Sequence, residues 1–322
     1  MRTAALLVPA LAVLLSACGG PQSMLGGGGS SAAAIETLWW AMFWAAVAIF
    51  ALVLFLAAVG GWRGRRAAPG TLMVAAGGLV LPVALLSVLL VYSVSLGERL
   101  ATATERAQLR IEVEGLQWWW RVEYPGAPGA VLANEIRLPV GVQVEIVLGS
   151  PDVIHSLWIP GLAGKQDMTP GRKAHLALLA EKPGVYRGQC AEFCGAQHAL
   201  MALYVVAMPP AEFDAWLARQ AEPAPTSEDA LLQRGREVFI EAGCGACHTV
   251  RGTPAKGRLG PDLTHVGGRL SIGAGLLPAN IGAIQGWIAD AQNHKPGNLM
   301  PSFNRLSGPD LNAVGAWLAS LE

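Results

Sequence analysis

Two uncharged, apolar stretches near the N-terminus constrain the fold of this chain more than any other feature. They run from about Leu38 to Gly61 and from about Leu72 to Val94. About 20 consecutive apolar residues suffice for a helix to cross the hydrocarbon core of a bilayer. Aromatic residues, which favour the membrane interface, lie near the ends of both stretches: Trp39, Trp40, Trp62 and Tyr92. We therefore predict a two-helix transmembrane hairpin over residues 35–96, and not two buried helices of a soluble protein.

The connection between the two stretches predicts their orientation. Residues 62–66 read Trp-Arg-Gly-Arg-Arg, and arginine-rich loops stay on the cytoplasmic side. Both termini should then lie outside the cytoplasmic membrane of a bacterium. Over the whole chain 52% of residues are hydrophobic and 14% are charged, against roughly 25% charged residues in soluble domains. The 23 basic and 23 acidic side chains give no net charge, so we expect no nucleic-acid partner.

The first residues have the pattern of an export signal. Arg2 precedes an apolar run, and Leu15-Ser-Ala-Cys18 resembles the cleavage box of bacterial lipoproteins. Residues 1–17 are therefore predicted to be a lipoprotein signal peptide and Cys18 the lipidated residue. An ordinary signal peptide with an incidental cysteine is the alternative. The Gly- and Ser-rich residues 18–34 have the composition of a tether that follows an anchor.

Beyond the hairpin the sequence pattern changes twice. Residues 107–219 contain short runs of alternating polar and apolar side chains between Gly and Pro, which predicts a β-sandwich or barrel. Residues 220–228 are Pro-rich, as interdomain linkers are. Residues 229–322 indicate a separate all-α domain, with Ser227 and Ser307 as candidate helix caps. The chain is thus predicted to be multidomain.

The β-rich segment contains a group of residues suited to copper. Its motif is Cys190-Ala-Glu-Phe-Cys194-Gly-Ala-Gln-His198-Ala-Leu-Met201. Thiolates, imidazole and thioether all favour copper, and a second cysteine allows two sulfurs to bridge two metals. The natural candidate for a second imidazole is His155, at the end of an apolar run. Alone, the cysteine pair could equally form a structural disulfide, because the exported side is oxidising.

The helical segment contains the attachment signature of a c-type haem. In Cys244-Gly-Ala-Cys247-His248, two thiols can bond the vinyl groups and the imidazole can ligate iron. A redox or disulfide pair that happens to precede a histidine is the alternative. Met300 lies between two turn elements about 50 residues later, as a distal ligand would. Methionine together with histidine raises the potential of the iron.

These motifs resemble one family. Residues 134–141, 152–160, 162–171 and 182 onward look like the cupredoxin-type domain of cytochrome c oxidase subunit II, and the C-terminal segment resembles a class I cytochrome c. The resemblance implies a two-helix transmembrane hairpin, an all-β cupredoxin-like copper-A domain and an all-α cytochrome c domain fused to its C-terminus. It also implies two cofactors on this chain, binuclear copper A and covalent haem c.

The resemblance assigns roles to individual residues. It implies Cys190 and Cys194 as bridging thiolates of copper A, and His155 and His198 as terminal ligands. Met201 and the Glu192 carbonyl would be weak axial ligands, and the Glu192 side chain would face a magnesium or manganese site shared with subunit I. Trp118 would be the point where electrons enter, although a run of tryptophans on a strand is more often core. In the cytochrome domain, the carbonyl of Pro261 would orient His248.

The implied function is that of an electron-transfer subunit of a respiratory oxidase. Electrons would pass from a donor cytochrome c through haem c and copper A to the haem of subunit I, where oxygen is reduced and protons are pumped. This chain would carry no oxygen chemistry itself. The alternatives are the copper-A subunit of a nitric oxide reductase and a membrane-anchored copper-binding or assembly protein.

The second apolar stretch departs from the family pattern. Residues 67–96 contain no acidic side chain, whereas many relatives place a proton-receiving glutamate near the start of the second span. A role for this subunit in proton uptake is therefore not expected.

The predicted sites account for all five cysteines, one for lipid, two for copper and two for haem. His175, His265 and His294 are expected to be ordinary solvated or satisfied side chains.

Overall fold

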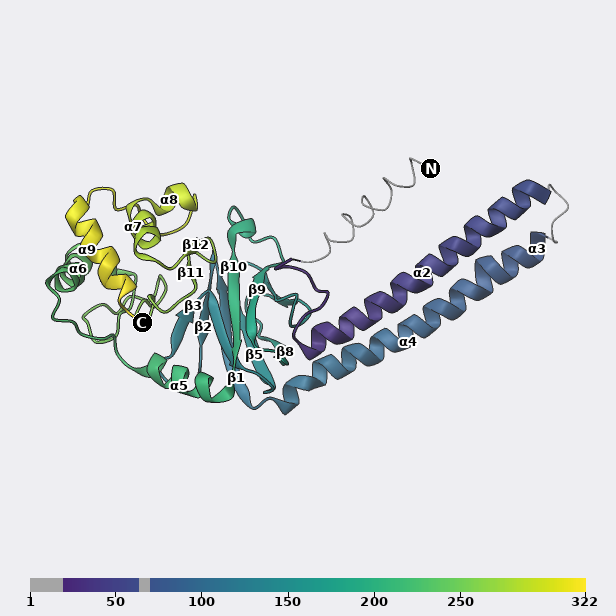
Figure 1. Cartoon of the computed structure of the whole chain (residues 1–322), viewed down its shortest axis with the longest axis horizontal. Helices are drawn as coiled ribbons and strands as arrows, with labels where there is room; N and C mark the ends of the chain where they lie inside the picture. Colours follow the sequence, from purple (N-terminus) through teal and green to yellow (C-terminus); the bar gives the residue numbers. More distant parts are fainter. Residues whose placement is uncertain (1–19, 64–69) are drawn as a thin grey trace, which may run out of the picture.

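The computed structural model describes residues 20–63 and 70–322. The predicted signal peptide, Cys18 and most of the arginine-rich connection lie outside the described residues. Figure 1 shows an elongated molecule with a helical hairpin at one end, β-sheets in the middle and small helices at the other end. The three predicted structural classes are confirmed, and they follow one another in the predicted order.

The hairpin consists of two long, apolar helical arms that, beyond the buried start of the first arm, are mostly exposed among the described residues. The first arm is α2 (Ser30–Arg63), and the second joins α3 (Gly70–Met73), η2 (Val74–Val80) and α4 (Leu81–Thr102). Both arms are long and apolar enough to cross a membrane, and their most apolar windows are 0% buried. In the second arm, η2 is a π-helical stretch just before Pro82, which has no backbone N–H to donate to the preceding turn. Fully exposed apolar helices of this length point to membrane anchoring.

The glycine-rich stretch before α2, expected to be a tether, is packed against the β-sheets. The amides of Gly28 and Gly29 both donate to the carbonyl of Gly161, at 2.8 and 3.1 Å. A Cβ atom on Gly29 would clash with the backbone of Leu162, lying 2.6 Å from its Cα. Glycine is therefore needed here for close approach of two backbones, and not for flexibility. We call residues 26–32 the N-terminal strap.

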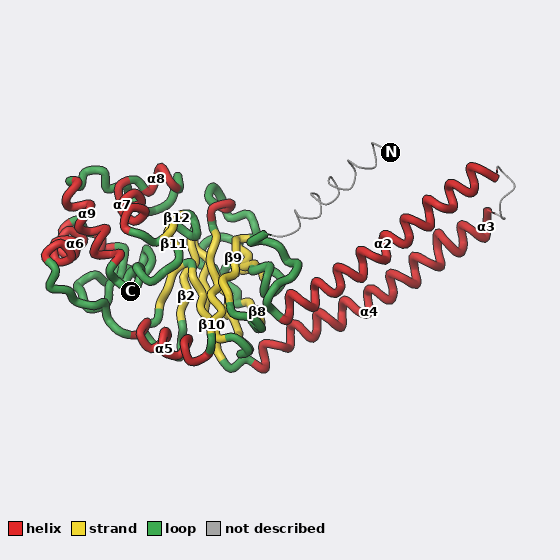
Figure 2. The backbone as a smooth tube through the Cα atoms, in the orientation of Figure 1, coloured by secondary structure: helices red, strands yellow, loops and turns green. Residues whose placement is uncertain are grey.

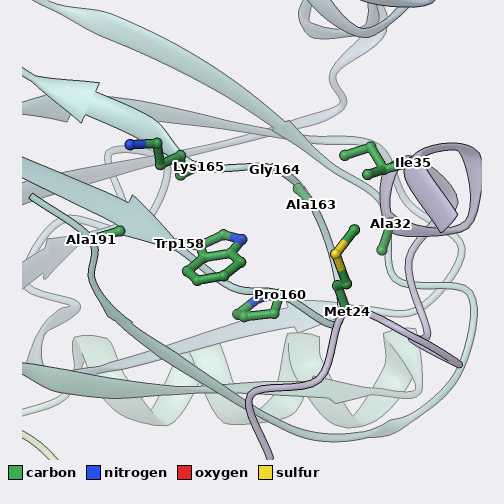
Figure 3. A pocket seen from close by; sticks show the side chains of 9 residues that line it. All are labelled: Met24, Ala32, Ile35, Trp158, Pro160, Ala163, Gly164, Lys165 and Ala191. Carbon is green, nitrogen blue, oxygen red and sulfur yellow. The ribbon is translucent and has the colours of Figure 1, made fainter. Parts of the chain in front are cut away.

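A cavity of about 430 Å³ lies beside the N-terminal strap. Figure 3 shows the side chains of Trp158 and Met24, which line it from opposite sides. The wall is almost entirely apolar, and its remaining residues are Ala32, Ile35, Pro160, Ala163, Gly164, Lys165 and Ala191. The strap therefore joins the foot of the hairpin to the β-sheets over an incompletely filled apolar contact.

The central domain is a sandwich of two five-stranded sheets, with strand orders β3-β2-β1-β5-β8 and β4-β10-β9-β6-β7. Its strands are β1 (Leu109–Leu116), β2 (Trp119–Glu123), β3 (Val131–Ala133), β4 (Glu135–Pro139), β5 (Val144–Gly149), β6 (His155–Trp158), β7 (Gln166–Met168), β8 (Ala174–Leu178), β9 (Gly184–Cys190) and β10 (Ala202–Met208). Alternation along β1 buries Ile111 and Val113 between the sheets. Figure 2 shows the strands as one compact block.

Helix α5 (Pro210–Ala221) closes one end of the sandwich. Its Phe213 and Trp216 pack on the ring of Tyr124, with ring centroids 6.3 and 5.5 Å away. The Tyr124 hydroxyl donates to the carbonyl of Arg137 and accepts from its amide, both at 2.8 Å. Burial raises the pKa of Tyr124. This aromatic cluster fixes the end of the sandwich from which the linker starts.

The C-terminal domain packs short helices around a second apolar core. Its elements are α6 (Ala230–Glu241), η5 (Cys244–Ala246), β11 (Ser271–Ile272), β12 (Leu277–Pro278), α7 (Ile281–Ala289), α8 (Ala291–His294) and α9 (Gly308–Ala319). Ser307 caps α9 as predicted. The cap of α6 is Asp229 and not Ser227, because the Asp229 carboxylate accepts from the amides of Leu231 and Leu232. The predicted cap was two residues too early.

Helices α6 and α9 cross at a glycine. A Cβ atom on Gly235 would lie 2.1 Å from the carbonyl oxygen of Ala313 and 2.6 Å from the Cβ of Trp317. Only a residue without a side chain lets the two helices approach this closely. The crossing also buries Trp317 against Phe239 at a ring-centroid distance of 5.1 Å. Gly235 thus sets the helix spacing in the C-terminal domain.

Replacing Gly235 with alanine should destabilise this domain by about 2 kcal/mol, because the added methyl overpacks the crossing. Thermal unfolding of the C-terminal domain, followed by near-UV circular dichroism, measures the effect. Gly282→Ala is the matched control, since its Cβ would meet nothing closer than 3.7 Å. Equal melting temperatures for the two variants would contradict the close-approach explanation.

Candidate copper and haem sites

Six residues predicted from the sequence lie together at one end of the sandwich. The ligand atoms of His155, Cys190 and Cys194 lie within 4.8 Å of one another. The two sulfurs lie 3.7 Å apart, and Cys190 Sγ lies 3.2 Å from the carbonyl oxygen of Glu192. Cys194 Sγ also lies 3.8 Å from His198 Nδ1 and 3.9 Å from Met201 Sδ. The side chain of Glu192 is half-buried.

Strand pairing brings these residues together from distant parts of the chain. His155 begins β6 and Cys190 ends β9, and the two strands pair with Leu157 opposite Cys190. The loop between β9 and β10 carries the remaining residues of the group. It is closed by the Cys190 amide, which donates to the Met201 carbonyl at 2.9 Å. The sheet therefore positions one histidine, and the closed loop positions the rest.

A carboxylate that sequence reasoning missed holds the ring of His155. Asp152 Oδ1 lies 2.9 Å from His155 Nε2, while Nδ1 of the same ring faces Cys190 Sγ at 3.9 Å. Nε2 therefore carries the proton and Nδ1 is left as the donor for a metal. Burial alone would raise the pKa of Asp152, but hydrogen bonds from His155 and from backbone amides lower it. Asp152 is thus ionised and able to fix the imidazole tautomer.

The two sulfurs are thiols or thiolates and not a disulfide. Their separation of 3.7 Å is far longer than the bond of about 2.05 Å in a disulfide. The hydrogen bond from the Cys194 thiol is the main cause that lowers the pKa of Cys190 to about 3, while the same contact raises the pKa of Cys194. The contact thus favours the thiolate at Cys190 and the thiol at Cys194.

The chemistry of these donors fits copper. Two buried sulfurs, two imidazole nitrogens, a thioether and a carbonyl converge on one small volume, and soft sulfur with imidazole is the donor set that copper favours. Space for His155 depends on Gly115, because a Cβ there would lie 2.9 Å from the imidazole Cγ. Gly115 is a second residue that the sequence alone did not single out.

The C-terminal domain places its predicted haem residues around one core. His248 Nδ1 donates to the Pro261 carbonyl at 2.8 Å, which leaves Nε2 for iron. Burial lowers the pKa of His248, so the imidazole is neutral, as a ligand must be. Cys244 and Met300 pack against the same apolar core, and Cys247 is a free thiol in the turn after η5. This donor set fits a covalently bound haem.

One further contact involves the predicted distal ligand. The indole Nε1 of Trp287 lies 3.1 Å from Met300 Sδ. The indole also stacks on the ring of His294, with centroids 6.3 Å apart. The other two histidines outside both sites are satisfied as expected: His175 pairs with Glu145, and His265 lies 3.0 Å from two carbonyl oxygens.

Trp118 lies between the two sites. Its indole Nε1 donates to the Cys194 carbonyl at 2.9 Å, and Gln117 Nε2 donates to the same oxygen at 2.8 Å. On its other side, the ring approaches Gly297, where a Cβ would lie 3.9 Å from Trp118 Cη2. Strand β2 begins only at Trp119, so Trp118 is free of the alternation that buries Trp120 in the core.

Comparison with known proteins places both domains. Residues 129–208 match the family described as cytochrome c oxidase subunit II, periplasmic domain, and residues 232–322 match the cytochrome c family. Cytochrome c oxidase subunit 2 of Bacillus sp. (strain PS3) is 32% identical over 261 residues, which cover 76% of this chain and 72% of that protein. The chain belongs to the cytochrome c oxidase subunit 2 family.

Other relatives carry the same description. Cytochrome c oxidase subunit 2 of Alkalihalophilus pseudofirmus is 40% identical over 212 residues, which cover 66% of this chain and 61% of that protein. The crystal structure of the periplasmic domain of subunit II of cytochrome oxidase of Bradyrhizobium japonicum is 28% identical and covers 36% of this chain and 96% of that one, with a TM-score of 0.34. Together with the two family matches, the ligand geometry identifies the cluster at Cys190 as the copper-site cluster of a subunit II domain, and the C-terminal domain as a cytochrome c domain that implies haem c.

Replacing Asp152 with asparagine should weaken copper binding by about 10- to 100-fold, because the ring of His155 loses the carboxylate that fixes its tautomer. Copper retention against a chelator, followed by the near-infrared absorption of the purified protein, measures this. Asp167→Asn changes an exposed acid on β7 and serves as the control. If both variants retain copper equally well, Asp152 does not orient the histidine.

Proposed function

We propose that this protein is the electron-transfer subunit of a respiratory cytochrome c oxidase. Electrons pass from a donor cytochrome c to the haem c domain, then to binuclear copper A, and then to the haem of subunit I for oxygen reduction coupled to proton pumping. When bound, haem iron and copper each take up and release single electrons. The residues of this chain hold both groups, and they carry no oxygen chemistry.

The contact between the two sites is the observation that carries this proposal. The loop that contains Met300 lies against Trp118, and Trp118 is hydrogen-bonded to the backbone of Cys194. Cys194 is one of the two proposed bridging ligands, with Cys190, His155, His198, Met201 and the Glu192 carbonyl completing the set. A short, packed path thus joins the proposed haem ligand loop to the copper loop, as an electron relay requires.

The second sulfur explains why two metals are proposed. A single cysteine, two histidines and a weak methionine describe a mononuclear blue-copper site, whereas Cys190 and Cys194 can each bridge two ions. The contact that lowers the pKa of Cys190 raises that of Cys194, so the positive charge of bound metal would favour two thiolates side by side. The side chain of Glu192 adjoins this site, and we propose it as a magnesium or manganese ligand shared with subunit I.

The hairpin supports the proposed location. Two exposed apolar arms support a membrane anchor, and the arginine-rich sequence 62–66 favours a cytoplasmic position for the connection between them. The copper and cytochrome domains then lie on the outer side of a bacterial cytoplasmic membrane, where a donor cytochrome can reach them. Cys18, if lipidated, adds a further anchor on that side.

Two cysteine variants test the relay from both ends in the purified complex. Cys190→Ser should lose the near-infrared copper absorption but keep the haem c band, and donor-reduced haem should then accumulate. Cys247→Ser should keep the copper absorption and lose normal covalent haem attachment. Oxygen uptake with the donor cytochrome should fall to background in both. Uptake that survives loss of copper would sink the proposal, and turnover of nitric oxide without oxygen turnover would assign a different acceptor.

A second test uses ionic strength. Because both sites belong to one chain, electron transfer from haem to copper is intramolecular and should change little between low and high salt, whereas reduction of the haem domain by a soluble donor should change strongly. Flash-induced kinetics followed at the haem c band and at the near-infrared copper absorption separate the two steps. A steep fall of the intramolecular rate with salt would contradict transfer within the chain.

A further inference from the structure

We propose that Lys295 is a positioning residue that locks the cytochrome domain onto Trp118, so that haem-to-copper transfer proceeds from one docked geometry and not from a tethered search. This inference rests on the proposed relay function and names the contact that would hold the two domains in one position during electron transfer. The observation behind it is a buried lysine that extends from one domain into the other.

The ammonium group of Lys295 is held entirely by backbone carbonyls. The residue is 3% exposed. Its Nζ donates to the carbonyls of Trp118 at 2.6 Å and Leu200 at 2.8 Å, both in the copper domain, and to Gly273 at 3.4 Å in its own domain. These three acceptors match the three N–H donors of an ammonium group.

The three hydrogen bonds offset the cost of burying this cation in the docked state. A buried cation is costly unless all of its donors are satisfied, and the ion pairs among residues 20–63 and 70–322 include none with Lys295. That cost is seen in the pKa of Lys295, which burial lowers to about 8. Two of the three acceptors belong to the copper domain, so any other position of the cytochrome domain would break those two bonds. The carbonyls therefore favour the one docked geometry in which all three accept from the buried ammonium group.

The residues after Lys295 complete the contact. Gln197, which is 7% exposed and lies in the copper loop, donates from Nε2 to the Pro296 carbonyl at 2.6 Å. Gly297 has a φ of +82°, which glycine adopts without strain, and its backbone lies against the edge of the Trp118 ring. Residues 295–297 therefore form one docking segment, seated between the copper loop and the tryptophan.

Directed contacts also hold the domains together around this segment. The carboxylate of Glu135, 1% exposed, accepts from the amide of Leu270 at 2.8 Å, and Arg137 donates to the Gly268 carbonyl at 2.8 Å. Arg121 donates to the carbonyl of Arg258 at 2.7 Å. Backbone acceptors and donors are thus matched across the boundary at several separate points. This is the pattern of a fixed interface and not of a domain that samples many positions.

Solvent viscosity distinguishes docking from tethered search in the intact purified complex. If the domains are locked, the flash-induced haem-to-copper rate of the wild type should be independent of added glycerol. Lys295→Met should slow that transfer by about tenfold or more and make it viscosity-dependent, because the domain must then find its partner within a tethered volume. Lys256→Met, at an exposed lysine of the same domain, should match the wild type.

The outcomes separate this inference from the relay itself. Absence of haem-to-copper transfer in the wild type would overturn the proposed function. Transfer that occurs but is already viscosity-dependent in the wild type would overturn docking alone, as would Lys295→Met kinetics that match those of Lys256→Met. Should Lys295→Met fail to assemble, Gln197→Ala removes the contact with Pro296 from the other side and should show the same viscosity dependence.

Discussion

The carbonyl oxygen of Cys194 links the copper loop to the segment that meets the cytochrome domain. It accepts hydrogen bonds from Gln117 Nε2 and from the indole of Trp118. The backbone amide of Gln117 donates to Asp152 Oδ2 at 2.7 Å, and Asp152 Oδ1 in turn contacts the ring of His155. One short chain of contacts therefore relates the copper loop, the histidine strand and the surface that meets the cytochrome domain. Displacement of any one of these segments would break or strain hydrogen bonds to the others.

Local sequence patterns predicted the classes of structure and most of the candidate site. Thiols, imidazoles and a thioether at Cys190, Cys194, His198 and Met201 fall within twelve residues, so the loop itself specifies their proximity. His155 was found because it ends an apolar run. The hairpin followed from uncharged length alone. Each of these signals is contained in neighbouring residues, which is why a single sequence reveals them.

Residues that act across large separations could not be predicted in this way. Gly115 on β1 matters because the two sheets pack face to face and bring it against His155 on β6. Asp152 lies only three residues before His155, but a carboxylate at that spacing is common in turns, and its contact with the imidazole is seen only in the folded loop. Lys295 could not be singled out from the sequence, since its two acceptors in the copper domain are 95 and 177 residues away. The glycine-rich strap was read as flexible because composition cannot distinguish freedom from close approach. Only the packed neighbours decide between the two.

The N-terminal strap also determines how the sandwich is attached to the hairpin. One attachment runs through α4 and the short turn η3 (Ala103–Arg106) into β1. The strap supplies the other, because its backbone bonds to Gly161 and the Ser30 amide bonds to the Leu179 carbonyl. Two separate attachments restrict rotation of the outer domain about either one. They therefore favour one orientation of the copper loop relative to the membrane helices.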